Sequence, residues 1–258
     1  MKKILVALLF ALSLINIPVF AEMVKVKKEV KNFDTISLQY PGVVHLKQGD
    51  TESLTIEAKD NTVIEKIDIK VSRNTLVIKS NKKWFSVDSS EKVNFYITMK
   101  NVKKILSGGS NAINIETPIK TDDLTIKISG NGSLKSTEDF TVHNELSLNC
   151  SGNIELGLRK LTVSSLDINI NGSGDIKILE GNVNKQKIII SGSGNYIAPE
   201  LESKESDISC YGSGKLEINA TEILKAKISG SGNVTYYGNP KEIEQKIFGN
   251  GTIKKSSK

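Results

Sequence analysis

Histidine and cysteine are the side chains that most often serve as nucleophiles, bases or metal ligands, and this sequence holds two of each. The histidines are His45 and His143, and the cysteines are Cys150 and Cys210. The histidines have no metal-ligand spacing between them or with Cys150, which disfavours a metal site or a catalytic triad. The sequence therefore predicts no metal, no cofactor and no catalytic residue.

Cleavage of polysaccharides needs convergent carboxylates, often with Arg or Lys, in a cleft that loop insertions build. Arg73 and Arg159 are the only arginines, and no carboxylate pair recurs at matching positions. Asp175 follows a Gly-Ser-Gly phrase as in a calcium-binding turn, but the matching positions elsewhere hold Asn, Ser, Lys and Thr. We therefore expect a structural role for Asp175 and no enzyme activity.

A short glycine phrase repeats through the second half of the chain and indicates which elements carry the side chains. Taking the second glycine of each phrase as the reference, the spacings are 20, 22, 20, 20, 18 and 19 residues. A weaker copy, ILSGGSNAI, starts at Ile105. The seven clear copies are ISGNGSL at Ile128, LNCSGNI at Leu148, INGSGDI at Ile170, ISGSGNY at Ile190, CYGSGKL at Cys210, ISGSGNV at Ile228 and IFGNGTI at Ile247.

Apolar residues alternate with polar ones on both sides of each glycine turn, which is typical of half-buried strands that meet at a corner. A repeat of about 20 residues with this alternation predicts an all-β fold, a single-stranded parallel β-helix or β-solenoid. Glycine suits the corner because a turn repeated in every coil needs positive φ and close backbone approach. In the outward row, Lys135, Glu155 and Lys177 are expected to form ion pairs across coils.

Two cysteines in an exported protein raise the question of a disulfide. The repeat places Cys150 two positions before the reference glycine and Cys210 four positions before it, three coils later. Three coils separate them by about 14 Å, beyond the reach of a disulfide. We expect two unpaired thiols, with Cys210 in an aliphatic core position and Cys150 in a glycine position.

The first 21 residues have the form of a secretory signal peptide, with Lys2 and Lys3 before an apolar run and a small-residue cleavage site at Ala21. We expect export through the inner membrane, to the periplasm, the outer surface or the medium. Residues 22–104 contain short alternating strands and are expected to form an N-terminal β cap on the coils of residues 105–258, in one continuous domain.

Charge and hydropathy argue against nucleic-acid binding and against a membrane-spanning helix in the exported chain. Removal of Lys2 and Lys3 lowers the formal charge from +6 to +4, and the remaining lysines are scattered, so we expect no nucleic-acid partner. No second apolar run reaches the 18 residues or so of a membrane helix, so we expect no transmembrane segment in residues 22–258.

The surface of the solenoid offers two candidate contacts. Trp84 and Phe85 lie in the polar interruption from Asn81 to Lys92, and could either contact a partner or cover the first coil. One position of the repeat forms an outward row of mostly small polar side chains, which could bind glycans or a surface protein or simply be the solvated side of a strand. The candidate row is Ser129, Asn149, Asn171, Ser191, Tyr211 and Ser229, with Phe248 at its end.

Several motifs resemble those of a known family. They are Phe33-Asp-Thr-Ile, the turn Lys47-Gln-Gly-Asp, the repeated Ser-Gly-Ser-Gly-Asn/Asp phrases and Tyr236-Tyr-Gly-Asn-Pro. With these, the chain from about Phe33 to Ile253 resembles the head GIN domain of putative auto-transporter adhesins. The resemblance implies an exported bacterial β-helical protein; the family is chiefly known as proteins of unknown function and supplies no catalytic residues to carry over.

These observations favour a non-enzymatic, exported β-solenoid that acts as an adhesin-like or envelope-associated binding module. The alternatives are a carbohydrate-active β-helix enzyme, such as a polysaccharide lyase or hydrolase, and a purely structural envelope protein. A groove with two carboxylates within about 10 Å would favour the enzyme. Flat faces of small residues would favour binding or structure.

Overall fold

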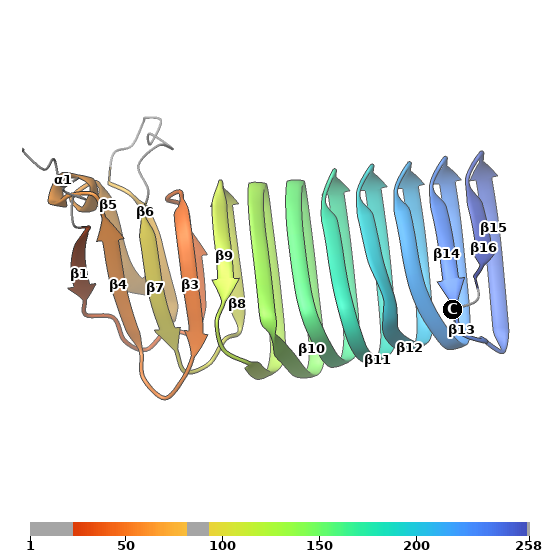
Figure 1. Ribbon diagram of the computed structural model, residues 1–258, viewed down its shortest axis with the longest axis horizontal. Helices are drawn as coiled ribbons and strands as arrows, with labels where there is room; N and C mark the ends of the chain where they lie inside the picture. The colour runs from red at the N-terminus through yellow and green to blue at the C-terminus, as the bar shows by residue number, and fades with distance from the viewer. Residues whose placement is uncertain (1–22, 82–92, 257–258) are drawn as a thin grey trace, which may run out of the picture.

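The computed structural model describes residues 23–81 and 93–256, and it confirms the predicted β-solenoid, with roughly 20 residues in each coil. Trp84 and Phe85 lie outside the described residues. The coils stack into a long, flattened body with the N-terminal strands at one end and the C-terminus at the other (Figure 1). The elements are β1 (Val24–Lys28), β2 (Thr35–Leu38), β3 (Gly42–Gln48), β4 (Ser53–Ala58), α1 (Asn61–Ile64), β5 (Ile67–Ser72), β6 (Thr75–Ser80), β7 (Asn94–Met99), β8 (Lys104–Gly109), β9 (Asn111–Ile115), β10 (Ile119–Gly172), β11 (Asp175–Gly192), β12 (Asn195–Gly212), β13 (Lys215–Gly230), β14 (Asn233–Tyr237), β15 (Glu242–Gly249) and β16 (Thr252–Lys255).

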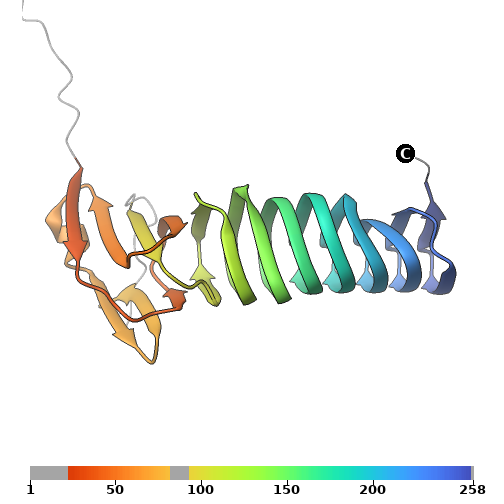
Figure 2. The same ribbon diagram turned by 90° about the horizontal axis from the view of Figure 1, so that it is seen from below.

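Two sheet faces enclose the core, as the view from below shows (Figure 2). The β8 face begins with β5, β6, β2 and β8, continues through the later halves of β11 to β13, and ends with β15. The β9 face begins with β1, β4, β7, β3 and β9 and ends with β14 and β16. From β8 and β9 onward every pairing is parallel, because each coil repeats the direction of the one before it.

A column of glycines forms the corner between the two faces. Each of these glycines has positive φ, and each one after Gly109 stands directly on the one in the previous coil, so that a Cβ on Gly212 would lie 2.0 Å from the carbonyl oxygen of Gly192. Only glycine fits such a stack. The column consists of Gly109, Gly130, Gly152, Gly172, Gly192, Gly212, Gly230 and Gly249.

The predicted register of one coil was wrong by two residues. Gly152 stacks on Gly130, and Gly172 stacks on Gly152, so Gly152 is the first glycine of its phrase and not the second. Ile154 takes the place of the second glycine, and Gly174 lies over it. Cys150 consequently lies in the aliphatic column between Ile128 and Ile170, and not in a glycine position.

The same shift alters the charged row of the β9 face. Lys135 and Glu155 do form an ion pair, at 2.8 Å, but Glu155 aligns with Asp175 and not with Lys177. The residue aligned with Lys177 is Gly157. The expected run of alternating charges is therefore interrupted by a residue without a side chain.

The core is mostly aliphatic, but it includes a buried polar cluster that the repeat pattern did not predict. Gln186 and Ser206 occupy a column that holds Leu166 and Leu224 in the neighbouring coils. The amide nitrogen of Gln186 donates to the hydroxyls of Ser203 and Ser206, both at 2.9 Å, and its oxygen accepts from the Tyr196 hydroxyl at 3.0 Å. Each polar group of this buried cluster thus has a partner.

The N-terminal strands extend both faces beyond the first coil. β2 pairs in parallel with β8, and β3 pairs in parallel with β9, whereas the outermost pairs β1–β4, β4–β7 and β5–β6 are antiparallel. Asp60 caps α1 by accepting from the backbone N–H of Val63 at 3.1 Å. The division between a cap of residues 22–104 and coils from residue 105 stays a prediction.

Substitution of two glycines by alanine should give opposite changes in stability. Gly212→Ala should lower the free energy of unfolding by at least about 1–2 kcal/mol, because its Cβ would meet the Gly192 carbonyl and its φ is +147°. Gly157→Ala should raise it by roughly 0.5 kcal/mol, because its Cβ would enter open space. Urea unfolding midpoints measure both, and equal midpoints would contradict the glycine stacking.

Removal of one hydroxyl should destabilise the buried cluster. Tyr196→Phe leaves the Gln186 amide oxygen buried without its donor, which should cost about 1–3 kcal/mol. Tyr211→Phe, at an exposed position, is the matched control and should leave the unfolding midpoint unchanged. If both variants unfold at the wild-type midpoint, the cluster does not contribute as described.

Candidate functional site

The outward row nearest the glycine corner on the β8 face contains six of the seven residues of the predicted row. Asn171 aligns with Ser191, Ser191 with Tyr211, Tyr211 with Ser229, and Ser229 with Phe248. Because Gly152 stacks on Gly130, Ser151 stands between Ser129 and Asn171. The contact row, as we name it, is therefore Ser129, Ser151, Asn171, Ser191, Tyr211, Ser229 and Phe248.

Asn149 does not belong to the contact row, because it lies two residues before Ser151. It stands in the adjacent row with Asn169, and each of these amides donates along its own strand, Asn149 to Ser147 at 2.9 Å and Asn169 to Asp167 at 2.7 Å. The next row alternates in charge over successive coils, with Asp167, Lys187, Asp207, Lys225 and Glu244. The β8 face is thus flat and polar over most of its length.

Two aromatic side chains interrupt this polar face near its C-terminal end. Tyr211 is 44% exposed and Phe248 is 61% exposed, and only the small Ser229 lies between them in the contact row. The ammonium group of Lys227 lies 5.8 Å from the Tyr211 ring centroid and 5.9 Å from that of Phe248. Two rings about 10 Å apart therefore flank a gap with a cation beside it.

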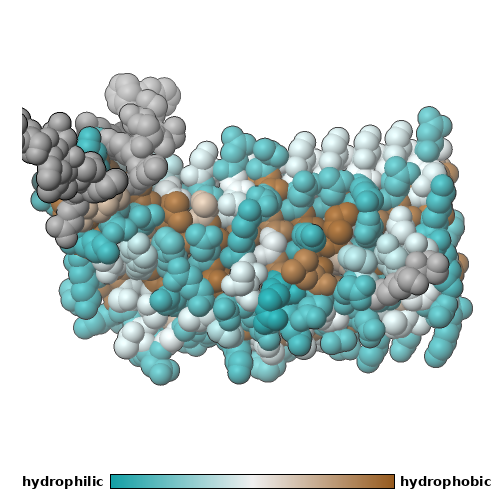
Figure 3. All heavy atoms as spheres, viewed as in Figure 1, coloured by the Kyte–Doolittle hydropathy of each residue, from teal (hydrophilic) through white to brown (hydrophobic). Residues whose placement is uncertain are grey.

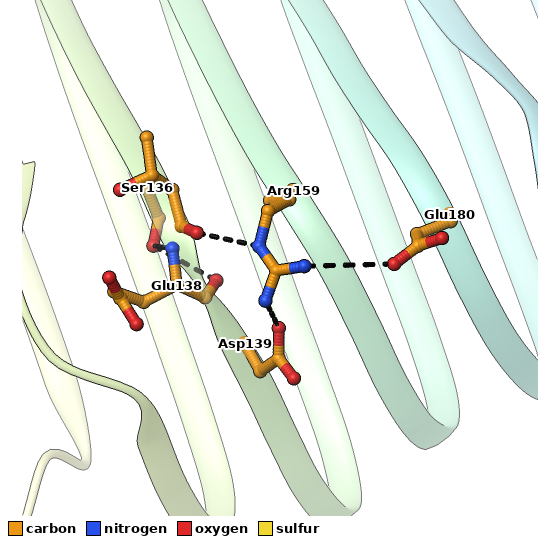
Figure 4. Close-up of polar contacts among 6 residues, drawn as sticks. Ser136, Glu138, Asp139, Arg159 and Glu180 are labelled. Atoms are coloured by element: carbon orange, nitrogen blue, oxygen red, sulfur yellow. Dashed lines mark hydrogen bonds and ion pairs between the residues drawn. The ribbon is translucent and has the colours of Figure 1, made fainter.

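Arg159, on the β9 face, joins three successive coils (Figure 4). Its Nε donates to the backbone carbonyl of Thr137 at 2.6 Å, its Nη2 contacts Asp139, and its Nη1 lies 3.8 Å from Glu180. Beside it, the Ser136 hydroxyl accepts from the backbone N–H of Glu138 at 3.0 Å. Since its donors are already engaged by the protein, Arg159 is a structural clamp rather than a catalytic group.

A second set of titratable residues lies on the outer surface of the N-terminal strands. His45 Nδ1 lies 2.6 Å from Glu116, and this hydrogen bond is the main cause that lowers the pKa of Glu116. The His45 ring stacks on Tyr96, whose hydroxyl donates to Glu57 at 2.8 Å and thereby raises the pKa of Tyr96. Sequence analysis missed this cluster because it joins residues 71 positions apart that only the pairing of β3 with β7 and β9 brings together.

The groups that could perform chemistry are dispersed over the molecule. Within residues 23–81 and 93–256, no three His, Cys, Asp or Glu side chains are grouped so that they could hold a metal ion. His143 is an exposed residue of β10, far along the chain from the His45 cluster. The two carboxylates nearest Arg159 are held by that clamp, so they do not form a free acid–base pair.

Glu155 and Asp175 align in adjacent coils and line the same groove, about 5 Å apart at the strand spacing. Glu155 pairs with Lys135, however, and Asp175 accepts from the Asn195 amide, so both carboxylates already have partners within the protein.

Both cysteines are free and buried in the core. Cys210 lies in the aliphatic column between Ile190 and Ile228, as predicted. Burial raises the pKa of the Cys150 thiol to about 11 and also raises that of Cys210. Neither side chain is therefore a reactive nucleophile in the folded protein.

A family model described as "Putative auto-transporter adhesin, head GIN domain" matches residues 32–240. The chain belongs to this family. The head GIN domain fold is also seen in solved structures of a putative adhesin from Parabacteroides merdae (22% identity, TM-score 0.82, 92% of this chain and 97% of that one) and a putative adhesin from Bacteroides fragilis (26%, 0.65, 91% and 97%).

A third solved structure with a similar fold is a putative lipid binding protein from Parabacteroides distasonis, with 22% identity, a TM-score of 0.75, and coverage of 92% of this chain and 98% of that one. Likeness at this identity shows the fold alone. Comparison with curated proteins gives no match. Among the described residues of this head GIN domain, no helix is long and apolar enough to cross a membrane.

The buried thiols predict a chemical behaviour of the native protein. At about pH 8 a thiol of pKa about 11 is only about 0.1% ionised, so Cys150 should resist alkylation by iodoacetamide, with burial adding a steric barrier. Cys210, whose pKa is also raised by burial, should likewise resist alkylation. Mass spectrometry should detect no modification in buffer and two modified thiols in denaturant; rapid labelling of the folded protein would contradict the core placement.

Proposed function

We propose that this protein is an exported, non-enzymatic binding module of the adhesin type, with residues 1–21 as its signal peptide and residues 22–104 as the cap of the solenoid. Its ligand is an extended acidic polysaccharide that lies along the contact row of the β8 face. Membership of a family described as putative auto-transporter adhesins supports export and an adhesin-like role. The placement of Tyr211, Phe248 and Lys227 is the observation that carries the choice of ligand.

Aromatic rings and small hydroxyl groups together suit sugars. An aromatic face packs against the C–H face of a sugar ring, while hydroxyl and amide groups bond to the sugar hydroxyls. Tyr211 and Phe248 stand two coils apart, about 10 Å, which is close to the length of a disaccharide. Ser191 and Asn171 continue the row beyond Tyr211 with groups that both donate and accept hydrogen bonds.

The positive charge beside the contact row favours an acidic polymer over a neutral one. Lys227 makes no ion pair among the described residues, and its ammonium group lies beside both rings. A carboxylate of a uronic acid bound between Tyr211 and Phe248 would therefore find a cation within reach. The neighbouring row also places Lys246 in the last coil, aligned with Lys227 and held by Glu244 at 2.6 Å.

The dispersal of most carboxylates, and the pairing of Glu155 and Asp175 with neighbouring side chains, support a binding rather than a cleaving role. The acidic residues of the β8 face alternate with lysines over the coils, and Asp167 is occupied by the Asn169 amide. General acid–base cleavage requires two carboxylates that face each other across the bond. The contact row, with small polar groups in successive coils, can make many weak hydrogen bonds to a ligand without cleaving it.

Retention on immobilised polygalacturonate, compared with dextran, tests the proposal. The wild-type protein should bind the acidic polymer, and Tyr211→Ser and Phe248→Ser should each weaken retention about 10-fold, the typical loss for a central aromatic contact. Leu179→Ser is the matched control, since Leu179 is 49% exposed on the opposite face, and it should bind like the wild type.

The same incubation distinguishes the alternatives. Release of reducing or unsaturated ends from the polymer would replace the proposal with a lyase or hydrolase. Equal retention of all three variants would place binding elsewhere on the molecule. Absence of retention of the wild type on polygalacturonate would contradict an acidic glycan ligand and favour a structural role.

A further inference from the structure

Gly157 interrupts an outward row of the β9 face without a backbone reason. Its φ lies outside the left-handed region, and a Cβ built on it would meet no atom within 4 Å. It therefore differs from the corner glycines after Gly109, whose neighbours leave no room for a side chain. The row, with aligned residues in successive coils, is Lys135, Gly157, Lys177, Ile197, Glu217, Thr235 and Lys254.

The missing side chain opens a groove of about 660 Å³ across several coils. Leu179, at 49% exposure, and Ile197 supply apolar side chains to its lining. Figure 3 shows apolar side chains gathered in the middle of the molecule and surrounded by hydrophilic ones. The groove runs from Lys135 to Lys215, which spans five coils and is about 19 Å long.

Most charged groups that line the groove are already paired within the protein. Lys135 pairs with Glu155 at 2.8 Å, Lys215 pairs with Glu217 at 2.5 Å, and Arg159 is engaged by its clamp. Asp175 accepts from the Asn195 amide at 2.7 Å. The Lys177 side chain, by contrast, makes no ion pair or hydrogen bond within residues 23–81 and 93–256, and Lys177 aligns with Gly157 on one side and Ile197 on the other.

We propose that this groove binds a single-chain carboxylate amphiphile, with the carboxylate held by the Lys177 ammonium group and the alkyl chain lying over Gly157 against Leu179 and Ile197. An apolar lining favours an alkyl chain over a sugar, and the one uncompensated cation selects an anionic head group. Gly157 leaves the space that the chain occupies. This site lies on the face opposite the contact row and is independent of glycan binding.

Calorimetric titration of the purified protein with dodecanoate, below its critical micelle concentration, tests the site. One dodecanoate should bind per protein, and acetate should bind at least 100-fold more weakly because it lacks the alkyl chain. Gly157→Leu fills the groove and should weaken dodecanoate binding at least 10-fold. Lys177→Gln keeps the stem and removes the charge, and it should weaken binding about 3-fold to 10-fold.

Matched controls separate the groove from general effects. Thr235→Leu adds the same side chain to the same row outside the groove and should bind dodecanoate like the wild type. By circular dichroism the variants should melt at or above the wild-type temperature, so that a loss of binding does not reflect unfolding. Unchanged binding by Gly157→Leu, or equal loss in Thr235→Leu, would overturn the proposal.

Two further probes test whether the ligand must be charged and whether it is a free amphiphile or a membrane surface. Dodecyl maltoside, below its critical micelle concentration, has the same chain without the charge and should bind more weakly than dodecanoate; equal affinity would remove the role of Lys177. Sedimentation with phosphatidylglycerol vesicles should leave the protein in the supernatant. Retention on vesicles without binding of free dodecanoate would overturn the proposal in favour of a membrane surface.

Discussion

The stacking of each coil on the one before it, at the spacing of hydrogen-bonded strands, is the constraint on which this structure depends. At the glycine corner the backbones approach so closely that a Cβ on Gly152 would lie 2.3 Å from the Gly130 carbonyl oxygen. Because that contact recurs in every coil, one residue type fixes the register of both faces. The aliphatic columns, the flat faces and the outward rows all follow from it.

This regularity explains where function can reside. A lattice of parallel strands presents the same kinds of side chains at the same spacing, so most rows are solvated and self-paired, as the alternation of Asp167, Lys187 and Asp207 illustrates. Recognition of a particular ligand needs a departure from the repeat. The departures on the two faces are of opposite kinds, since Tyr211 and Phe248 add large side chains where the row is small, whereas Gly157 removes one.

The fold could be predicted from the sequence because the glycine phrases indicate the length of each coil and the alternation of apolar residues indicates its strands. The error at Cys150 has a simple physical origin. Side chains alternate between the two sides of a strand with a period of two, so a shift of two residues keeps every side chain on its own side. The apolar pattern therefore fitted both registers, and the positive φ of Gly152 together with its stacking between Gly130 and Gly172 distinguishes them.

The candidate sites were harder to predict from the sequence than the fold. The contact row could be approximated because its members share one repeat position, but the Gly157 groove depends on the corrected register, which aligns that glycine with Lys177. The pair of His45 and Glu116 joins segments 71 residues apart through a pairing that the local sequence does not encode. The repeat does align Gln186 with Ser206, but not the hydrogen bond from the Tyr196 hydroxyl across the core. Such contacts require knowledge of which strands are neighbours.

The position of the chain ends has a mechanical consequence. The first described strand and the C-terminus lie at opposite ends of the long axis, and the hydrogen bonds between coils run along that axis (Figure 1). Tension between the two ends would load these bonds lengthwise and detach terminal coils one at a time, in the manner of a repeat array whose units contact only their neighbours. Each detached coil would release about 20 residues of slack. A tethered molecule of this design could absorb a pull in steps while its central coils stayed folded.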